Sequence, residues 1–102
     1  MSNKAKILDI AMNLNRVGNL AADDYDRKKK RIAVFLDETT EYINSIDKSS
    51  LSKSFKDTFD KFLKEYKLLE KEKIRTVKKQ LDWAEEMMTW GNILTHRTKF
   101  LP

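Results

Sequence analysis

The chain has 102 residues and a formal net charge of +5, and 36% of its residues are charged while 40% are hydrophobic. This composition is too apolar for an intrinsically disordered chain and too charged for a membrane-embedded one. The sequence contains no cysteine, which excludes disulfide bonds and thiolate metal sites within it.

Glycine and proline, which end helices and shape loops, are scarce in this chain. There are two glycines and one proline, and neither residue type occurs between Gly18 and Gly91. Sheets and long loops need such residues, whereas helices do not. The composition therefore predicts a single all-α domain over residues 1–102. We expect an antiparallel helical bundle of three to four helices with one long C-terminal helix.

Two helices are expected in the first half of the chain. The first covers residues 4–17 and the second residues 20–46, because apolar residues recur there at spacings of three and four. Gly18 and Asn19 are interpreted as the end of one helix and the cap of the next. The apolar positions that define these two helices are Ile7, Ile10, Ala11, Leu14, Val17, Leu20, Tyr25, Ile32, Phe35, Leu36, Thr39, Ile43 and Ile46.

A third helix is predicted over residues 50–90, followed by a short tail over residues 93–102. Its apolar residues alternate at spacings of three and four, as in the seam of a coiled coil. A break near Glu70–Lys73 is the alternative, and it gives a compact four-helix bundle. No residue in that segment is a helix breaker, so the continuous helix is preferred.

The apolar seam of the third helix is expected to form the core with the first two helices. Large aromatic residues dominate its first half, so the core should depend strongly on them. We predict that Phe55, Phe59, Phe62, Tyr66, Ile74, Val77 and Leu81 face Ile7, Ile10, Leu14, Ile32, Phe35, Leu36 and Ile43.

The chain carries no sequence signal for a membrane. No apolar run approaches the roughly 18 residues that span a bilayer. The first residues lack the apolar core of a signal peptide. Together with the missing cysteines, these features lead us to expect a cytoplasmic protein that does not bind a membrane.

Catalytic residues are hard to assign in this sequence. His96 is the single histidine, so neither a nucleophile–base pair nor a di-iron site is expected. Carboxylates offer one route to an enzyme, because an antiparallel helix pair could bring two acidic clusters together around Mg²⁺. The clusters are Asp37, Glu38 and Glu41 on the second helix, and Asp82, Glu85 and Glu86 on the third.

The acidic segment Asp37–Glu41 resembles the all-α nucleotide pyrophosphatases, which use pairs of Glu-rich helices. The second acidic element of that family is not recognisable at a suitable distance, so the chain departs from the family's pattern. We therefore predict no catalytic residue, no metal site and no cofactor. A Mg-dependent all-α phosphohydrolase remains the third hypothesis for function.

Basic residues form the densest charged feature of the sequence. Five consecutive cations occupy residues 27–31, and further lysines follow one side of the predicted third helix. Such a surface could bind phosphates of a nucleic acid or another polyanion, although no aromatic residue lies between the lysines to stack on bases. The candidate residues for polyanion binding are Arg27, Lys28, Lys30, Arg31, Lys64, Lys67, Lys71 and Lys78.

A second apolar face near the C-terminus is the strongest sign of an interaction surface. Leu81, Ala84 and Met88 share one side of the helix, and a second apolar set lies roughly 120° away at 100° per residue. Either this segment lies in the centre of the bundle, or the second face contacts another molecule. The second set, predicted as a self or partner interface, is Trp83, Met87, Trp90 and Leu94.

The sequence thus favours a small, non-enzymatic helical protein that binds another protein and forms a homodimer. A nucleic-acid-associated helical subunit of a larger complex is the alternative. The two hypotheses differ in their salt dependence, because phosphate contacts weaken steeply as salt rises.

Overall fold

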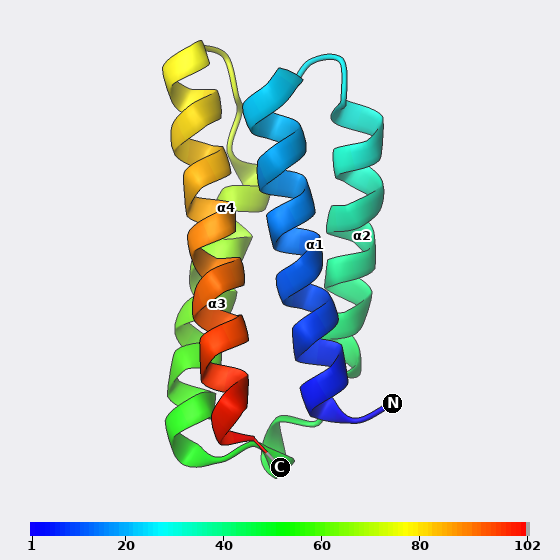
Figure 1. The fold of residues 1–102 in the computed structure, drawn as a ribbon, viewed down its shortest axis with the longest axis vertical. Coiled ribbons are helices and arrows are strands. Elements are labelled where there is room, and N and C mark those ends of the chain that lie inside the picture. The colour runs from blue at the N-terminus through cyan, green and yellow to red at the C-terminus, as the bar shows by residue number, and fades with distance from the viewer. Residues whose placement is uncertain (102) are drawn as a thin grey trace.

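The computed structural model describes residues 1–101, and these form an antiparallel bundle of four α-helices (Figure 1). Two short 3₁₀ helices, Lys48–Ser50 and Thr98–Phe100, follow α2 and α4. The described residues contain no strand, so the predicted all-α bundle is confirmed. The four helices are α1 (Asn3–Asp24), α2 (Lys29–Ser45), α3 (Lys53–Lys71) and α4 (Val77–Arg97).

Helix α1 continues through the glycine that was expected to end it. The predicted boundaries at residues 17 and 20 are wrong, because α1 reaches Asp24 and the chain turns over residues 25–28. Gly18 has no positive φ and is buried. It is therefore a packing residue rather than a helix stop.

The predicted continuity of the third helix over residues 50–90 is also wrong, and the alternative of four helices is correct, with α4 as the long C-terminal helix. The chain leaves helical geometry at Glu72 and enters α4 at Val77. Thr76 caps α4, because its hydroxyl accepts a hydrogen bond from the Lys79 N–H at 3.1 Å. Threonine is a favoured residue at the N-cap of a helix, and here this preference outweighs the helix-forming residues that precede Thr76.

Helix α4 passes through Gly91, where the sequence predicted a stop, and ends at Arg97. Most of the predicted tail is therefore helical, with the 3₁₀ helix at Thr98–Phe100 after it. The last residue of that tail, Pro102, lies outside the described residues.

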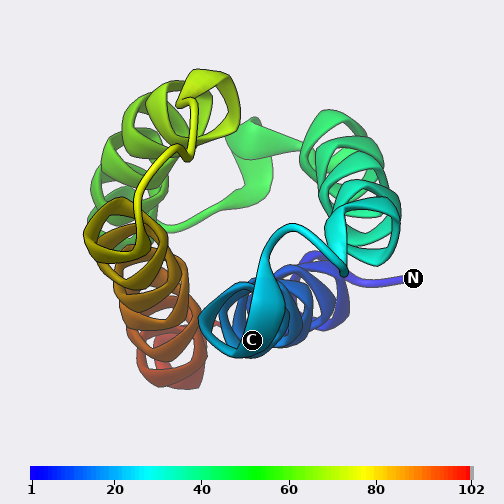
Figure 2. The ribbon, with the colours of Figure 1, turned by 90° about the horizontal axis from the view of Figure 1, so that it is seen from above.

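The helices follow one another around the bundle in the order α1, α2, α3, α4 (Figure 2). Helix α1 makes extensive contact with both α2 and α4, whereas α3 approaches α4 closely at few points. Aromatic side chains of α3 occupy the centre, with Phe59 and Phe62 fully buried. The bundle therefore combines one tight helix pair, α1 with α4, and one helix held by large side chains.

Both glycines of the chain lie where α1 and α4 touch. A Cβ atom at Gly18 would overlap Met88 Cγ and lie 2.9 Å from the Ala84 carbonyl oxygen. A Cβ atom at Gly91 would lie 2.9 Å from the Ala11 carbonyl oxygen. The missing side chains thus allow the two backbones to approach, and this close approach defines the α1–α4 seam.

The predicted core is confirmed in its first half and wrong at two later positions. Phe55, Phe59, Phe62 and Tyr66 are buried, whereas Ile74 is half-buried. Val77 and Leu81 are 71% and 48% exposed, because the break before α4 changes which face of the helix meets the core. The partner residues Ile7, Ile10, Leu14 and Ile32 are buried, and Phe35, Leu36 and Ile43 lie half-buried at the core's edge.

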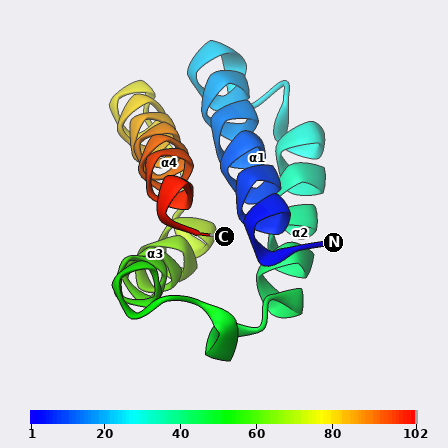
Figure 3. The same cartoon turned by 60° about the horizontal axis from the view of Figure 1, so that its bottom comes forward.

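None of the helices among residues 1–101 is long and apolar enough to cross a membrane. The ends of the four helices divide between the two ends of the bundle. The upper end carries the α1–α2 and α3–α4 connections (Figure 1). The lower end carries the α2–α3 connection, the start of α1 and the residues after α4 (Figure 3).

Candidate functional site

The predicted tryptophan interface lies inside the bundle. Trp83 is 3% exposed, and Met87 and Leu94 are fully buried. Trp90 is half-buried, with its ring centroid 5.6 Å from that of Phe62. The interpretation of these four residues as an outward-facing interface is wrong, and the alternative of a central helix is correct.

Trp83 joins three helices at the upper end of the core. Its indole N–H donates a hydrogen bond to the Leu69 carbonyl oxygen at 2.8 Å, in the last turn of α3. Its ring also meets Tyr25 edge-on, with the centroids 5.7 Å apart. Trp83 therefore supplies a hydrogen-bond donor to the Leu69 carbonyl oxygen, which lies near the end of α3 where the chain turns towards α4.

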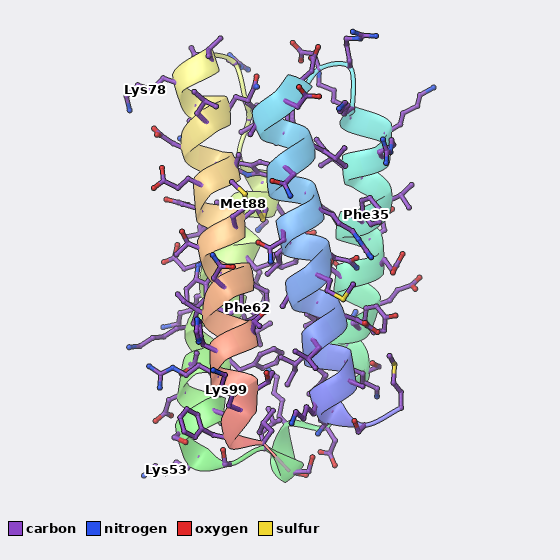
Figure 4. The ribbon with its side chains drawn as sticks, viewed as in Figure 1. Phe35, Lys53, Phe62, Lys78, Met88 and Lys99 are labelled. Atoms are coloured by element: carbon purple, nitrogen blue, oxygen red, sulfur yellow. The ribbon has the colours of Figure 1, made fainter. Side chains whose placement is uncertain are left out.

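The outer side of the α1–α4 pair forms a different surface, on which uncharged side chains line the seam and Glu85 lies at the border. In Figure 4 the two helices face the viewer side by side, and Met88 marks the seam between them. Helical spacing places two rows of uncharged residues on this side of the seam. This uncharged face consists of Ala5, Leu8, Met12, Asn15, Asn19 and Ala22 on α1, and Val77, Leu81, Met88, Asn92 and Thr95 on α4.

The uncharged face concentrates exposed apolar side chains. Met12, Leu81 and Val77 are 49%, 48% and 71% exposed, and Leu8 and Met88 beside them are half-buried. On the other two helices, Val34 and Leu68 are the exposed large apolar residues, one on each. Three of the seven exposed large apolar residues among residues 1–101 thus lie on this face.

The basic candidates fall in two places, the upper end of the bundle and the exposed side of α3. Arg27, Lys28, Lys30 and Arg31 occupy the α1–α2 connection and the first turn of α2. The other upper-end candidates are Lys71, at the end of α3, and Lys78, which Figure 4 labels in the first turn of α4. Two groups that lie far apart in the sequence therefore reach the same end of the bundle.

The predicted basic stripe ends at Lys71, where α3 ends, and Lys78 lies on a different helix. Lys64 and Lys67 remain on the exposed side of α3, near Asp60. Part of the basic run is also neutralised locally. Lys28 pairs with Asp23 and holds the pKa of that carboxyl below its usual range.

The two acidic clusters are not brought together. One lies on α2 and the other on α4, and these helices sit diagonally across the bundle (Figure 2). No group of three or more metal-ligating side chains that could hold an ion occurs among residues 1–101. His96 is exposed near the end of α4. The geometry therefore does not place the two acidic clusters around a common site.

An open acidic hollow lies between α3 and α4, lined in part by Glu65, Asp82 and Glu86. Partial burial, followed by the charges of Glu72 and Glu65, raises the pKa of Glu86. Lys79, which pairs with Glu72, lies close enough to oppose this shift. Glu85, Thr89 and Trp90 complete the lining of this hollow.

No known protein family, curated protein or solved structure shows significant similarity to this chain. The functional assignment therefore rests on the surfaces of the bundle itself. The uncharged face was not predicted from the sequence, because Val77 and Leu81 were assigned to the core and Asn19 to the start of a helix. Its signal is present in the sequence as uncharged residues at positions 8, 12, 15, 19 and 22.

Proposed function

We propose that this chain is a non-enzymatic helical interaction protein that pairs with a second copy of itself through the uncharged face. The observation that carries the proposal is a cluster of eleven uncharged residues along the α1–α4 seam, with the exposed Met12, Val77 and Leu81 among them, in a chain that is 36% charged. Solvated helix faces normally carry charged residues, whereas the centres of interfaces are depleted of them.

The size of the face supports a second copy as the occupant. The bundle measures 39 × 21 × 20 Å, and the face extends along most of its length. One side of such a bundle covers about 800 Å², which is the area that each partner buries in a standard interface. A two-fold arrangement would let the same patch serve both copies.

The electrostatics also support self-pairing. Two copies of a chain with a net charge of +5 repel each other wherever their cations meet. The uncharged face is the side on which two copies can approach without placing like charges opposite each other. Pairing elsewhere on the bundle would bury charged side chains at a considerable cost.

The side chains of the face suit a helix-on-helix contact. Met12 and Met88 are flexible and can fill irregular gaps between two packed surfaces. Asn15, Asn19 and Asn92 can form hydrogen bonds across the interface and thereby fix its register. The missing cysteines are consistent with our expectation of a reducing, cytoplasmic setting.

The proposal is tested by placing charges in the face and measuring the molar mass by light scattering. The double variant Met12→Lys/Leu81→Lys should be a folded monomer, because both substitutions put like charges into the interface. The matched control Val34→Lys/Leu68→Lys adds the same charge at exposed apolar positions of α2 and α3. It should remain a dimer.

Two outcomes would contradict the proposal. One is an unmodified protein that is monomeric at micromolar concentration. The other is a dimer that survives in Met12→Lys/Leu81→Lys and is lost in Val34→Lys/Leu68→Lys, since the interface would then lie on the other side of the bundle. Circular dichroism of every variant confirms that the helices are intact.

A further inference from the structure

The charges of this chain are segregated along the bundle axis. The upper end comprises the last turns of α1 and α3, the first turns of α2 and α4, and the connections between them. The lower end comprises the opposite helix turns with their connection and terminal segments. In residues these are 21–32 and 68–80 for the upper end, and 1–6, 42–56 and 94–101 for the lower end.

Both ends are strongly positive and the middle is negative. The upper end holds ten Lys and Arg residues and five Asp and Glu residues, and the lower end holds seven and one. The middle of the bundle holds the remaining four cations and ten acids. The formal side-chain charges are therefore +5, +6 and −6 from end to end.

The cations of the lower end are free of ion pairs among the described residues. The four ion pairs within residues 1–101 all involve lysines of the upper end. Figure 4 shows Lys53, at the start of α3, and Lys99, after α4, at the lower end. The complete set at this end is Lys4, Lys6, Lys48, Lys53, Lys56, Arg97 and Lys99.

The upper end keeps an excess of cations after its ion pairs are counted. Lys28, Lys29, Lys78 and Lys79 are paired with acids. Six further cations of this end form no ion pair among residues 1–101, and three of them are arginines, whose guanidinium groups match phosphate geometry. They are Arg27, Lys30, Arg31, Lys71, Lys73 and Arg75.

Helix stability does not explain this arrangement. None of the four helices has an acidic residue in its first turn, and each has at least two lysines or arginines there. Cations at a helix start oppose the helix dipole and therefore weaken the helix. The placement costs stability at four sites, which points to an external anion as its purpose.

We infer that each end of the bundle binds the phosphate backbone of a nucleic-acid duplex, so that one molecule bridges two duplex segments. A duplex carries one charge per roughly 1.7 Å, so the 20 Å width of one end lies against about ten phosphate charges. The ends are about 39 Å apart, several times the roughly 8 Å screening length at physiological salt, and act independently.

The negative middle explains why the contact is end-on. A duplex lying along the bundle would meet the acidic residues of α2 and α4, which repel phosphate. Phe100 is the single exposed aromatic residue among residues 1–101, whereas single-strand binding relies on successive aromatic platforms. A flat anionic membrane could contact only one end at a time. A duplex therefore fits the two-ended charge better than a single strand or a lipid surface.

The experiment measures binding and bridging separately, with two short DNA duplexes of mixed sequence that carry a donor and an acceptor dye. Binding is read from the anisotropy of one duplex, and bridging from energy transfer between the two. The upper-end variant is Lys30→Glu/Arg31→Glu/Arg75→Glu, and the lower-end variant is Lys53→Glu/Lys56→Glu/Lys99→Glu. All six residues are exposed and form no ion pair among residues 1–101.

In the Met12→Lys/Leu81→Lys background, which removes pairing of two copies, each end variant should still bind one duplex but lose energy transfer, and the combined variant should bind none. Four of the six substitutions put an acid into a first helix turn, which favours folding. The matched control Lys61→Glu/Lys64→Glu/Lys67→Glu makes the same charge change on the middle of α3 and should keep binding and bridging.

The inference is overturned if the unmodified protein binds no duplex at low salt, or if an end variant in that background bridges as well as Met12→Lys/Leu81→Lys alone. Binding to phosphatidylserine vesicles without binding to duplex would also overturn it. The variant Met12→Lys/Leu81→Lys distinguishes bridging by a single molecule from bridging by a dimer. Bridging must persist in that variant, as in Val34→Lys/Leu68→Lys, and its loss would mean that two copies are needed.

Discussion

At the residue scale, the two glycines and Trp83 show how a local signal can be outweighed by packing. Gly18 and Gly91 both resemble helix stops in the sequence, yet both lie inside helices where α1 and α4 touch. Trp83 resembles an interface residue, yet its N–H bonds a buried carbonyl. A single sequence does not reveal which glycine faces another backbone, because that depends on the tertiary contact.

Gly18→Ala should lower the free energy of unfolding by up to about 2 kcal/mol. Alanine improves helix propensity by about 1 kcal/mol, but overpacking the seam costs about 1–3 kcal/mol. The added Cβ would meet Met88 Cγ and the Ala84 carbonyl oxygen. Urea denaturation measures the change, and in a Met88→Ala background the cost should shrink. A stabilised Gly18→Ala variant would show that the seam is looser than described.

Trp83→Phe should cost about 2 kcal/mol, since it removes a buried hydrogen bond to the Leu69 carbonyl oxygen and part of the core volume. Trp90→Phe is the matched control, because Trp90 is half-buried and forms no side-chain hydrogen bond among residues 1–101. Thermal or chemical unfolding of both variants compares them directly. Equal losses in the two variants would argue against the role of the indole N–H.

Glu86→Gln should stabilise the protein at neutral pH. Partial burial and the neighbouring acids raise the pKa of Glu86, so its carboxylate form weakens the folded state. The advantage of the variant should be full above this raised pKa and should disappear as the pH falls through it and the carboxyl protonates. Unfolding curves across this range test the sign, and a variant that is less stable at pH 7 would contradict it.

At the scale of elements, the sequence was sufficient to predict that the chain is helical and that the aromatic residues of α3 lie in the core. The spacing of Phe55, Phe59 and Phe62 matches one helix face, and all three are buried. The break after Lys71 could not be predicted with certainty, because the segment from Glu72 to Thr76 contains no glycine or proline. Two interactions favour a reversal there. Thr76 caps the start of α4, and the Trp83 N–H donates a hydrogen bond to the Leu69 carbonyl oxygen.

Truncating the buried face of α3 should be far more harmful than truncating its exposed face. Phe62 is fully buried, and Phe62→Ala should cost about 3–5 kcal/mol. Leu68 on the same helix is 66% exposed, and Leu68→Ala should change stability by less than about 0.5 kcal/mol. Denaturant unfolding of the two variants provides the comparison, and similar losses would mean that α3 is rotated.

At the scale of the whole molecule, the fold gathers features that the sequence keeps apart. The uncharged face combines residues from the first and last quarters of the chain, and the lower basic end combines cations from five segments. Sequence reasoning found the run at residues 27–31 because it is contiguous. It could not find the other surfaces, because they exist only once α1 and α4 are side by side.

The central claim is that two copies pair through the uncharged face, and the molar mass of the unmodified protein tests it most directly. Sedimentation equilibrium at micromolar concentration should give about twice the chain mass of 12.1 kDa. Because the residues of the uncharged face are apolar or neutral polar, the dimer should persist when salt is raised from about 0.1 to 1 M, where charge contacts are screened. A mass of one chain at both salt concentrations would contradict the claim.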